Sequence, residues 1–179
     1  MYPQDRLLCD KNAPHPHTWI ARKHVYLQKP ERPAERPTML IEVIAVGKLK
    51  DRGLEQLCAT YVKRVQPFAK VTVVEAKNTE AVRKRLASLR GGATVLLDER
   101  GQQPTTKTFA DWISSWRQQN LTKVALCIGD AHGFSDEDRR AATHLLGLSH
   151  LTLPHRLARL LLLEQIYRAC SLLSPRLGS

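Results

Sequence analysis

Residues 39–46 read MLIEVIAV, a nearly continuous run of apolar and β-branched side chains. Such a run is typical of a strand that is covered on both faces, as strands are in parallel sheets. Two later runs, ATVLL at 93–97 and KVALCI at 123–128, have the same character. Buried strands therefore recur along the chain, and they predict a sheet that lies inside the molecule.

Segments with helical spacing of apolar residues separate these runs. We expect helices at 52–66, 79–89, 105–119 and 155–173, and one that follows the Ser135 cap and ends at Gly147. We expect two further short strands, at 71–74 and 151–153. Strands that alternate with helices predict an α/β layered fold with a mostly parallel sheet. The apolar stripe of the third segment, with Phe109, Trp112, Ile113 and Trp116, favours a core role over a base-stacking platform.

The segment 155–173 is apolar around most of its circumference. A helix that is apolar on all sides must be buried on all sides. In a body of this size, that requirement predicts a subunit partner, most simply a two-fold dimer. Arg159, Glu164 and Arg168 interrupt the apolar run and oppose a membrane-spanning helix. The pattern leaves open whether they form interface salt bridges or belong to a site.

The chain has 179 residues and a formal net charge of +11, which favours a polyanionic partner such as nucleic acid or an acidic membrane surface. Residues 48–90 carry eleven basic and four acidic side chains, so we expect the positive surface there. The four cysteines are far apart, which opposes a disulfide framework or a zinc site. With no long apolar run and no signal-peptide pattern, the sequence predicts a cytosolic protein.

Residues 1–38 differ from the rest in composition, because they hold six of the ten prolines and show no sustained apolar period. Proline removes backbone donors and restricts φ, so we expect no helix or central strand here. The segment is predicted to be a disordered extension, or to lie upstream of a native start at Met39. The folded domain is then residues 39–179.

Three loops follow expected strands, where ligands bind in α/β sheets: LDERG at 97–101, IGDAHG at 128–133 and LSHLTLPH at 148–155. Gly129 and Gly133 bracket a turn that lets a ligand approach the backbone. The turn matches neither the dinucleotide-binding fingerprint nor the P-loop. The chain has no nucleophile elbow, and its histidines are not spaced as a metal set, so we expect neither covalent hydrolysis nor a bound metal.

Several motifs in one order resemble a known family. Residues 151–169, LTLPHRLARLLLLEQIYRA, closely resemble the signature of the ribosomal RNA large subunit methyltransferase H family. MLIEVIAVGKLK at 39–50 resembles the start of that family. LLDERGQ at 96–102 and CIGDAHG at 127–133 resemble its two glycine-containing loops.

The resemblance implies a SPOUT-type α/β knot domain with a C-terminal deep trefoil knot, in a homodimer joined through the last helix. It implies an S-adenosylmethionine-dependent methyltransferase that modifies N3 of pseudouridine 1915 in 23S rRNA of assembled ribosomes. The cofactor would lie in the knot and be held largely by backbone. By motif position, its contacts would be Leu97, Gly129, Gly133, Leu148, Ser149, His150, Leu151, Thr152 and Leu153.

The mechanism implied is direct displacement, in which the protein positions N3 and helps to remove its proton. Arg159 and His155 are the catalytic candidates, and residues 48–90 would attract rRNA. The chain departs from the family pattern at Asp130, where the second glycine of I-G-G is usual, and in its ending SPRLGS, where a His-Pro-Tyr-His-type tail is usual. Two alternatives follow: a non-catalytic relative that binds cofactor and ribosome, and an unrelated α/β enzyme that acts on a small molecule.

Overall fold

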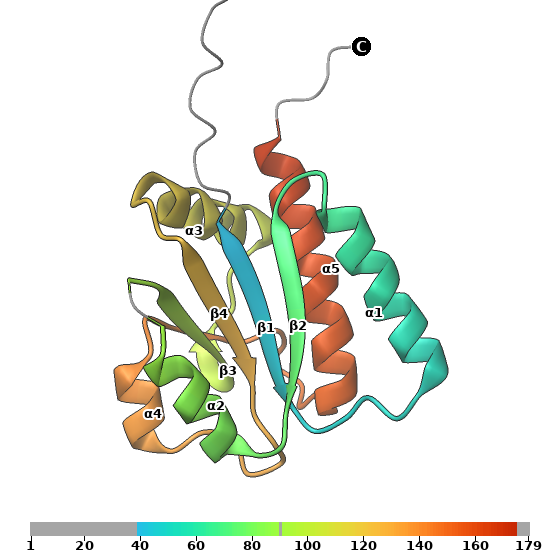
Figure 1. Cartoon of the computed structure of the whole chain (residues 1–179), viewed down its shortest axis with the longest axis vertical. Helices are drawn as coiled ribbons and strands as arrows, with labels where there is room; N and C mark the ends of the chain where they lie inside the picture. Colours follow the sequence, from blue (N-terminus) through green and yellow to red (C-terminus); the bar gives the residue numbers. More distant parts are fainter. Residues whose placement is uncertain (1–38, 90, 175–179) are drawn as a thin grey trace, which may run out of the picture. The chain divides into compact units, whose positions relative to one another are not determined.

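A computed structural model describes residues 39–89 and 91–174 of the chain. Its five strands form one parallel sheet in the order β2-β1-β4-β3-β5 (Figure 1). The strands are β1 (Leu40–Val46), β2 (Lys70–Ala76), β3 (Ala93–Gln102), β4 (Lys123–Ile128) and β5 (His144–Leu146). The predicted α/β class with a parallel sheet is confirmed. The predictions for residues 1–38 and for the last five residues lie outside the described part.

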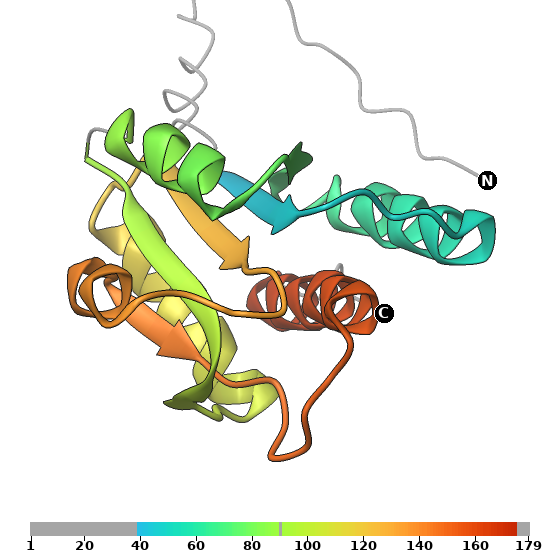
Figure 2. The same ribbon diagram turned by 90° about the horizontal axis from the view of Figure 1, so that it is seen from below.

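Five helices cover the two faces of the sheet (Figure 2). They are α1 (Arg52–Val65), α2 (Thr79–Ala87), α3 (Thr106–Gln118), α4 (Asp136–Ala141) and α5 (His155–Leu173). Helices α1, α3 and α5 lie on one face, where α5 packs against both of the others. Helices α2 and α4 lie on the opposite face.

Alternation along the strands explains this three-layer packing. In β1, Ile41 and Val43 belong to the core beneath α1, α3 and α5, whereas Ile44 belongs to the core beneath α2. Strand β4 divides in the same way, with Leu126 on the first side and Cys127 on the second. Because successive side chains of a strand point to opposite faces, a continuous apolar run is required when both faces are covered.

Two expected elements differ from the structure. The helix after Ser135 ends at Ala141 rather than at Gly147, and residues 144–146 form β5, parallel to β3. Helix α4 has no buried residue, so its capping box and charges stabilise little more than one turn. The strand expected at 151–153 is absent: Leu151 is 77% exposed, and β5 already occupies the edge of β3.

The tryptophan stripe of α3 is confirmed as core. Phe109, Ile113 and Trp116 are buried. Trp112 is half-buried and stacks on the imidazole of His144 in β5, with ring centroids 4.6 Å apart and planes 14° apart. Burial lowers the pKa of His144, which favours the neutral ring in this stack.

Glycine allows a very close contact between β3 and the end of β5. A Cβ added at Gly101 would lie 2.6 Å from the carbonyl carbon of Leu146 and 2.7 Å from the nitrogen of Gly147. The Gly147 N–H donates to the carbonyl of Gln102 at 2.8 Å. This contact determines where the chain leaves β5 for the segment that leads to α5.

We predict that Gly101→Ala destabilises the protein by about 1–3 kcal/mol, because the new methyl group meets backbone that has no room to move. Thermal unfolding should show a fall in Tm of at least about 4 °C. Gly53→Ala is the matched control, since its Cβ meets no backbone and only one side-chain atom, Asp51 Oδ1, at 3.3 Å, in the first turn of α1. Equal Tm values for the two variants would contradict the packing described.

Strand β1 carries one carboxylate, Glu42, and this residue is only 2% exposed. It accepts hydrogen bonds from Arg85 of α2 at 2.6 and 3.0 Å, and Lys123 of β4 lies 3.0 Å away. The hydrogen bonds from Arg85 hold the pKa of Glu42 below its ordinary value of 4.5, against the opposing effect of burial. The ion pairs therefore tie α2 to the centre of the sheet.

A lowered folded-state pKa means that the stabilisation is complete above pH 4.5 and is lost as the pH falls below that value. We predict that Glu42→Gln lowers the free energy of unfolding at neutral pH by about 1–3 kcal/mol. It should also flatten the loss of stability on acidification. Urea unfolding at a series of pH values measures both effects. The exposed Glu137→Gln is the control, and curves that run parallel for wild type and Glu42→Gln would refute the role of this carboxylate.

Candidate functional site

A cavity of about 550 Å³ lies beyond the carboxyl ends of β4 and β5 and beside the middle of β3. Three segments enclose it: residues 97–99 within β3, the turn 129–133 after β4, and the segment 146–155 that leads to α5. Cavities of this size and place in an α/β fold are those that hold small molecules. The three motif segments singled out from the sequence therefore meet at one site. The expectation that LDERG at 97–101 is a loop was wrong, because β3 continues to Gln102.

The cavity brings together most of the residues proposed for cofactor binding. Those that line it are Leu97, Gly129, Gly133, Leu148, Ser149, Leu151, Thr152 and Leu153. His150 does not; its side chain is exposed, and its Nδ1 lies 3.1 Å from the amide nitrogen of Gln103. His155, the first residue of α5, is exposed and lines the cavity. That these residues bind a ligand stays a prediction.

Arg159, the other catalytic candidate, lies outside this cavity. Its guanidinium is buried and donates to Glu75 Oε1 at 2.8 Å and to the Gly47 carbonyl at 2.8 Å. The same Glu75 oxygen accepts from the Leu49 N–H, and these bonds lower the pKa of Glu75. Arg159 lines a second cavity, of about 400 Å³, between α1 and β2. Arg159 thus links α5 to the ends of β1 and β2 through hydrogen bonds. Its catalytic role stays a prediction.

The turn after β4 presents backbone to the cavity. A Cβ at Gly129 would lie 3.2 Å from Gly133 Cα and 3.3 Å from the ring of Phe134, so this position has little room for a side chain. Gly133 has a φ of +69°, which favours glycine, and its N–H donates to the Asp130 carbonyl at 3.0 Å. The two glycines therefore keep the turn compact at the cavity, and its role in binding a ligand stays a prediction.

The carboxylate of Asp98 on the β3 wall is fully engaged. Oδ2 accepts from Arg139 Nε at 2.7 Å and Oδ1 accepts from the Arg100 N–H at 2.9 Å. Arg139 also donates to Asp136 at 2.8 Å, and it lines the cavity. Sequence reasoning missed Arg139, because α4 carries two adjacent arginines and no local pattern shows which one turns inward. The pair neutralises the charge of Asp98 and links β3 to α4.

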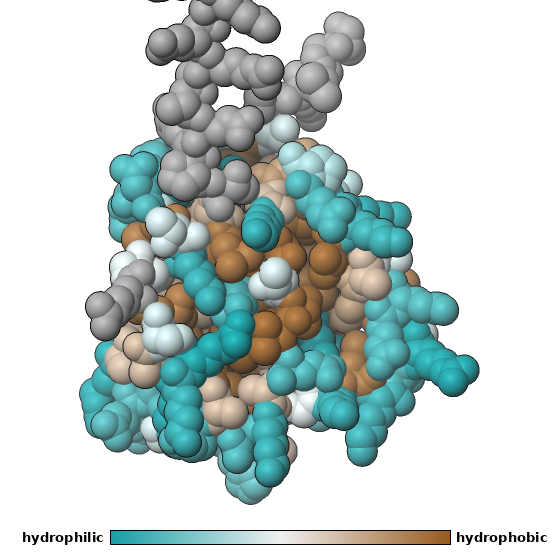
Figure 3. All heavy atoms as spheres, viewed as in Figure 1, coloured by the Kyte–Doolittle hydropathy of each residue, from teal (hydrophilic) through white to brown (hydrophobic). Residues whose placement is uncertain are grey.

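The basic segment 48–90 is partly used inside the fold. Arg85 pairs with Glu42, and Arg83 pairs with Asp138 of α4. The cations of this segment that the structure leaves exposed and without an ion pair include Lys63, Arg64, Lys70, Lys77 and Lys84. On the face drawn in Figure 3, polar side chains border a hydrophobic area over β1 and β2.

Two further properties hold for the described residues. Among them, no three or more His, Cys, Asp and Glu side chains are grouped as a metal site. None of the helices in this part of the chain has the length and apolar character needed to cross a membrane.

Comparisons with known proteins identify the family. A family model described as "Predicted SPOUT methyltransferase" matches residues 39–176. The chain is 38% identical over 146 residues to the ribosomal RNA large subunit methyltransferase H of Geobacter sulfurreducens, covering 75% of this chain and 95% of that protein. It is 37% identical over 149 residues to the protein of the same name from Thiobacillus denitrificans, with the same coverage.

Among solved structures, a putative methylase family protein from Neisseria gonorrhoeae matches with a TM-score of 0.47 and 14% identity, covering 84% of this chain and 91% of that chain. The knot that the resemblance implies stays a prediction. The family model and the curated relatives confirm the resemblance itself: the chain belongs to the SPOUT methyltransferase family, among the relatives of the ribosomal RNA large subunit methyltransferase H proteins.

Proposed function

We propose that the chain transfers the methyl group of S-adenosylmethionine to N3 of pseudouridine 1915 in 23S rRNA of assembled ribosomes. The observation that carries this proposal is the cavity beside β3 and beyond the ends of β4 and β5. It is enclosed by the three segments that hold the family motifs, in a chain whose relatives are named as methyltransferases of ribosomal RNA. We place the cofactor in this cavity and the target base at its mouth.

The residues present fit such a cofactor. Apolar side chains that line the cavity, among them Leu97 of β3, Ile128 of β4 and Leu148, suit the faces of an adenine ring. The glycine turn 129–133 offers backbone polar groups that no Cβ obstructs. When bound, S-adenosylmethionine supplies a methyl group already activated by its positive sulfur. The protein then needs neither a metal nor a covalent intermediate for this transfer.

The protein's own task is to hold N3 in line and to remove its proton. His155 is our candidate for the proton acceptor, because its imidazole is exposed at the start of α5 and lines the cavity. The exposed cations of α1, β2 and α2 would attract the phosphate backbone regardless of its sequence. Action on ribosomes implies a cytoplasmic location.

We also propose that the active form is a homodimer joined through α5. Leu157 and Leu161, four residues apart on this helix, are 42% and 40% exposed, and Leu172 is 62% exposed. Leu57 of α1, which packs beside α5, is 48% exposed. Leucines gathered on two adjacent helices form a surface that a second copy would cover. Arg168 pairs with Glu164 on the same helix, so these charges need no other partner.

The decisive test is transfer of labelled methyl from S-adenosylmethionine to assembled ribosomes that lack the modification, with mapping of the product. We expect incorporation at N3 of the target pseudouridine. His155→Ala should lower kcat by about 100-fold or more at saturating ribosome. Arg156→Ala, which alters the next exposed residue of α5, is the control and should leave kcat nearly unchanged.

The other outcomes identify the alternatives. Cofactor binding without transfer would support the non-catalytic relative that binds cofactor and ribosome. If the chain binds neither S-adenosylmethionine nor ribosomes, the proposal is wrong and the unrelated small-molecule enzyme gains support. If His155→Ala and Arg156→Ala have equal kcat values, the enzyme stands but the proton acceptor lies elsewhere.

For the dimer, we predict that Leu161→Glu shifts the protein from dimer to monomer in sedimentation equilibrium, because a carboxylate would be buried in an apolar interface. Ala141→Glu adds the same charge to an exposed position of α4, on the opposite face of the sheet, and should leave the dimer intact. A dimer that persists in Leu161→Glu at unchanged affinity would place the interface away from this part of α5.

A further inference from the structure

One face of helix α2 contacts the segment that follows β4, which forms one wall of the cavity. Thr79, Val82 and Arg83 are spaced at i, i+3 and i+4, so they point the same way. They meet residues of the segment that follows β4. Thr79 bonds to Asp130 and Arg83 bonds to Asp138. Val82 lies in one apolar cluster with Phe134. Among these six residues, only Asp130 lines the cavity. A helix that does not line the site thus holds the segment that forms one of its walls.

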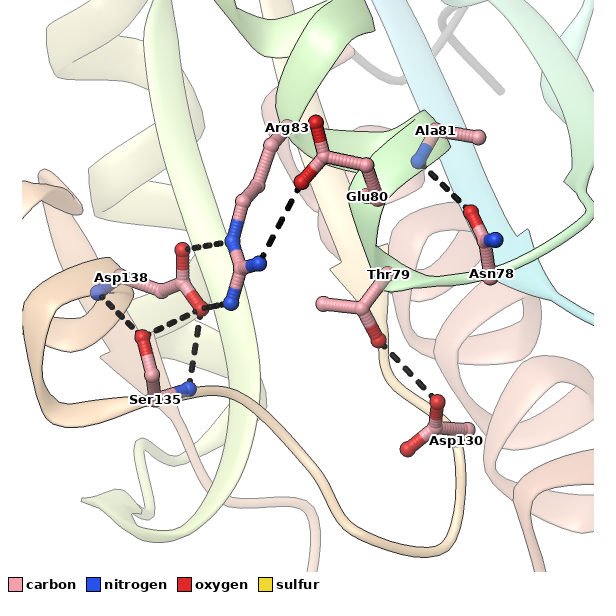
Figure 4. Close-up of polar contacts among 8 residues, drawn as sticks. All are labelled: Asn78, Thr79, Glu80, Ala81, Arg83, Asp130, Ser135 and Asp138. Atoms are coloured by element: carbon pink, nitrogen blue, oxygen red, sulfur yellow. Dashed lines mark hydrogen bonds and ion pairs between the residues drawn. The ribbon is translucent and has the colours of Figure 1, made fainter.

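The contact next to the cavity is the hydrogen bond between Thr79 and Asp130 (Figure 4). Thr79 Oγ1 donates to Asp130 Oδ2 at 3.1 Å. The other oxygen, Oδ1, accepts from the backbone N–H of His132 at 2.9 Å. One carboxylate therefore joins the start of α2 to the interior of the glycine turn. This bond depends on the acidic side chain, and a glycine at position 130 could not make it.

Two further contacts keep α2 in place. Val82 and Phe134 are buried at 0% and 3% exposure in the same apolar cluster. Arg83 donates two hydrogen bonds of 2.7 Å to the two oxygens of Asp138 (Figure 4). Asp138 in turn accepts from the backbone and hydroxyl of Ser135, which caps α4. Because α2 is anchored at these points, the Thr79 hydroxyl is presented from a fixed position.

We infer that Thr79 and Asp130 are positioning residues of the cofactor cavity: their hydrogen bond holds the turn 129–133 in the form that binds ligand. The inference rests on the proposed function, since the ligand is S-adenosylmethionine. A turn that must be ordered on binding reduces affinity, whereas a turn held in advance does not. Thr79 thus controls affinity from outside the cavity, through Asp130.

The test measures the Kd of S-adenosylmethionine by calorimetry on the full chain. Thr79→Val removes the hydroxyl at nearly constant shape. We expect Kd to rise about fivefold, because this is the change that the loss of one hydrogen bond usually causes. Thr79→Ser keeps the hydroxyl and should restore a near wild-type Kd. Thr60→Val, the same change at an exposed position of α1, is the matched control.

A double-mutant cycle separates this role from a general loss of stability. If Thr79 acts through Asp130, then Thr79→Val should raise Kd no further in an Asp130→Ala background. In the ligand-free protein, Thr79→Val should also speed hydrogen exchange of the His132 and Gly133 amides, which bond to Asp130. Tm should change equally little in Thr79→Val and Thr79→Ser.

The outcomes are distinguishable. If the wild-type chain does not bind S-adenosylmethionine, the proposed function fails and the inference about its affinity fails with it. If the wild type binds and Thr79→Val binds equally well, only the inference is overturned. Equal weakening by Thr79→Val and Thr79→Ser, or effects that multiply in the double variant, would also overturn it.

Discussion

The close contact between Gly101 of β3 and the backbone at Gly147 is the constraint on which the rest of the structure depends. Because two backbones meet with no side chain between them, β5 can end against β3 and the chain can turn at once toward α5. The segment that follows forms one wall of the cavity, and α5 then packs between α1 and α3. A methyl group at this contact would displace the cavity wall and the last helix together.

Ion pairs hold the surrounding elements to this framework at particular points. Arg85 and Lys123 meet Glu42, Arg139 meets Asp98, and Arg159 meets Glu75. Each pair joins elements that are distant in sequence, and Glu42, Asp98 and Arg159 are buried. Part of the large basic excess therefore serves the fold. The exposed lysines and arginines that remain are those available to a polyanion.

The long strands and the segments that line the cavity could be predicted from sequence, because the apolar composition of runs such as KVALCI indicates burial. The continuation of β3 through LDERG at 97–101 is polar, so its strand structure could not be predicted in this way. The short strand β5 could not, since its three residues take their structure from pairing with Val95, Leu96 and Leu97, about 50 positions earlier. The contacts of Arg159 could not be predicted from the sequence either. Its partner Glu75 is 84 residues away, and an arginine in an apolar helix has the same local pattern whether it faces a ligand or a carboxylate.

The cavity wall combines apolar side chains with polar ones, among them Asp98, Arg139 and His155, and these polar residues form no motif that identifies a site by itself. Glycines give a clearer signal: Gly129 has crowded surroundings, and Gly133 has a φ of +69°. The proposed control of affinity acts through one lining residue, Asp130, from a helix outside the cavity. The bond from Thr79 to Asp130 spans 51 residues and comes from a side chain that does not line the cavity. A change at Thr79 can therefore alter the affinity for a ligand without replacing any residue that lines the cavity.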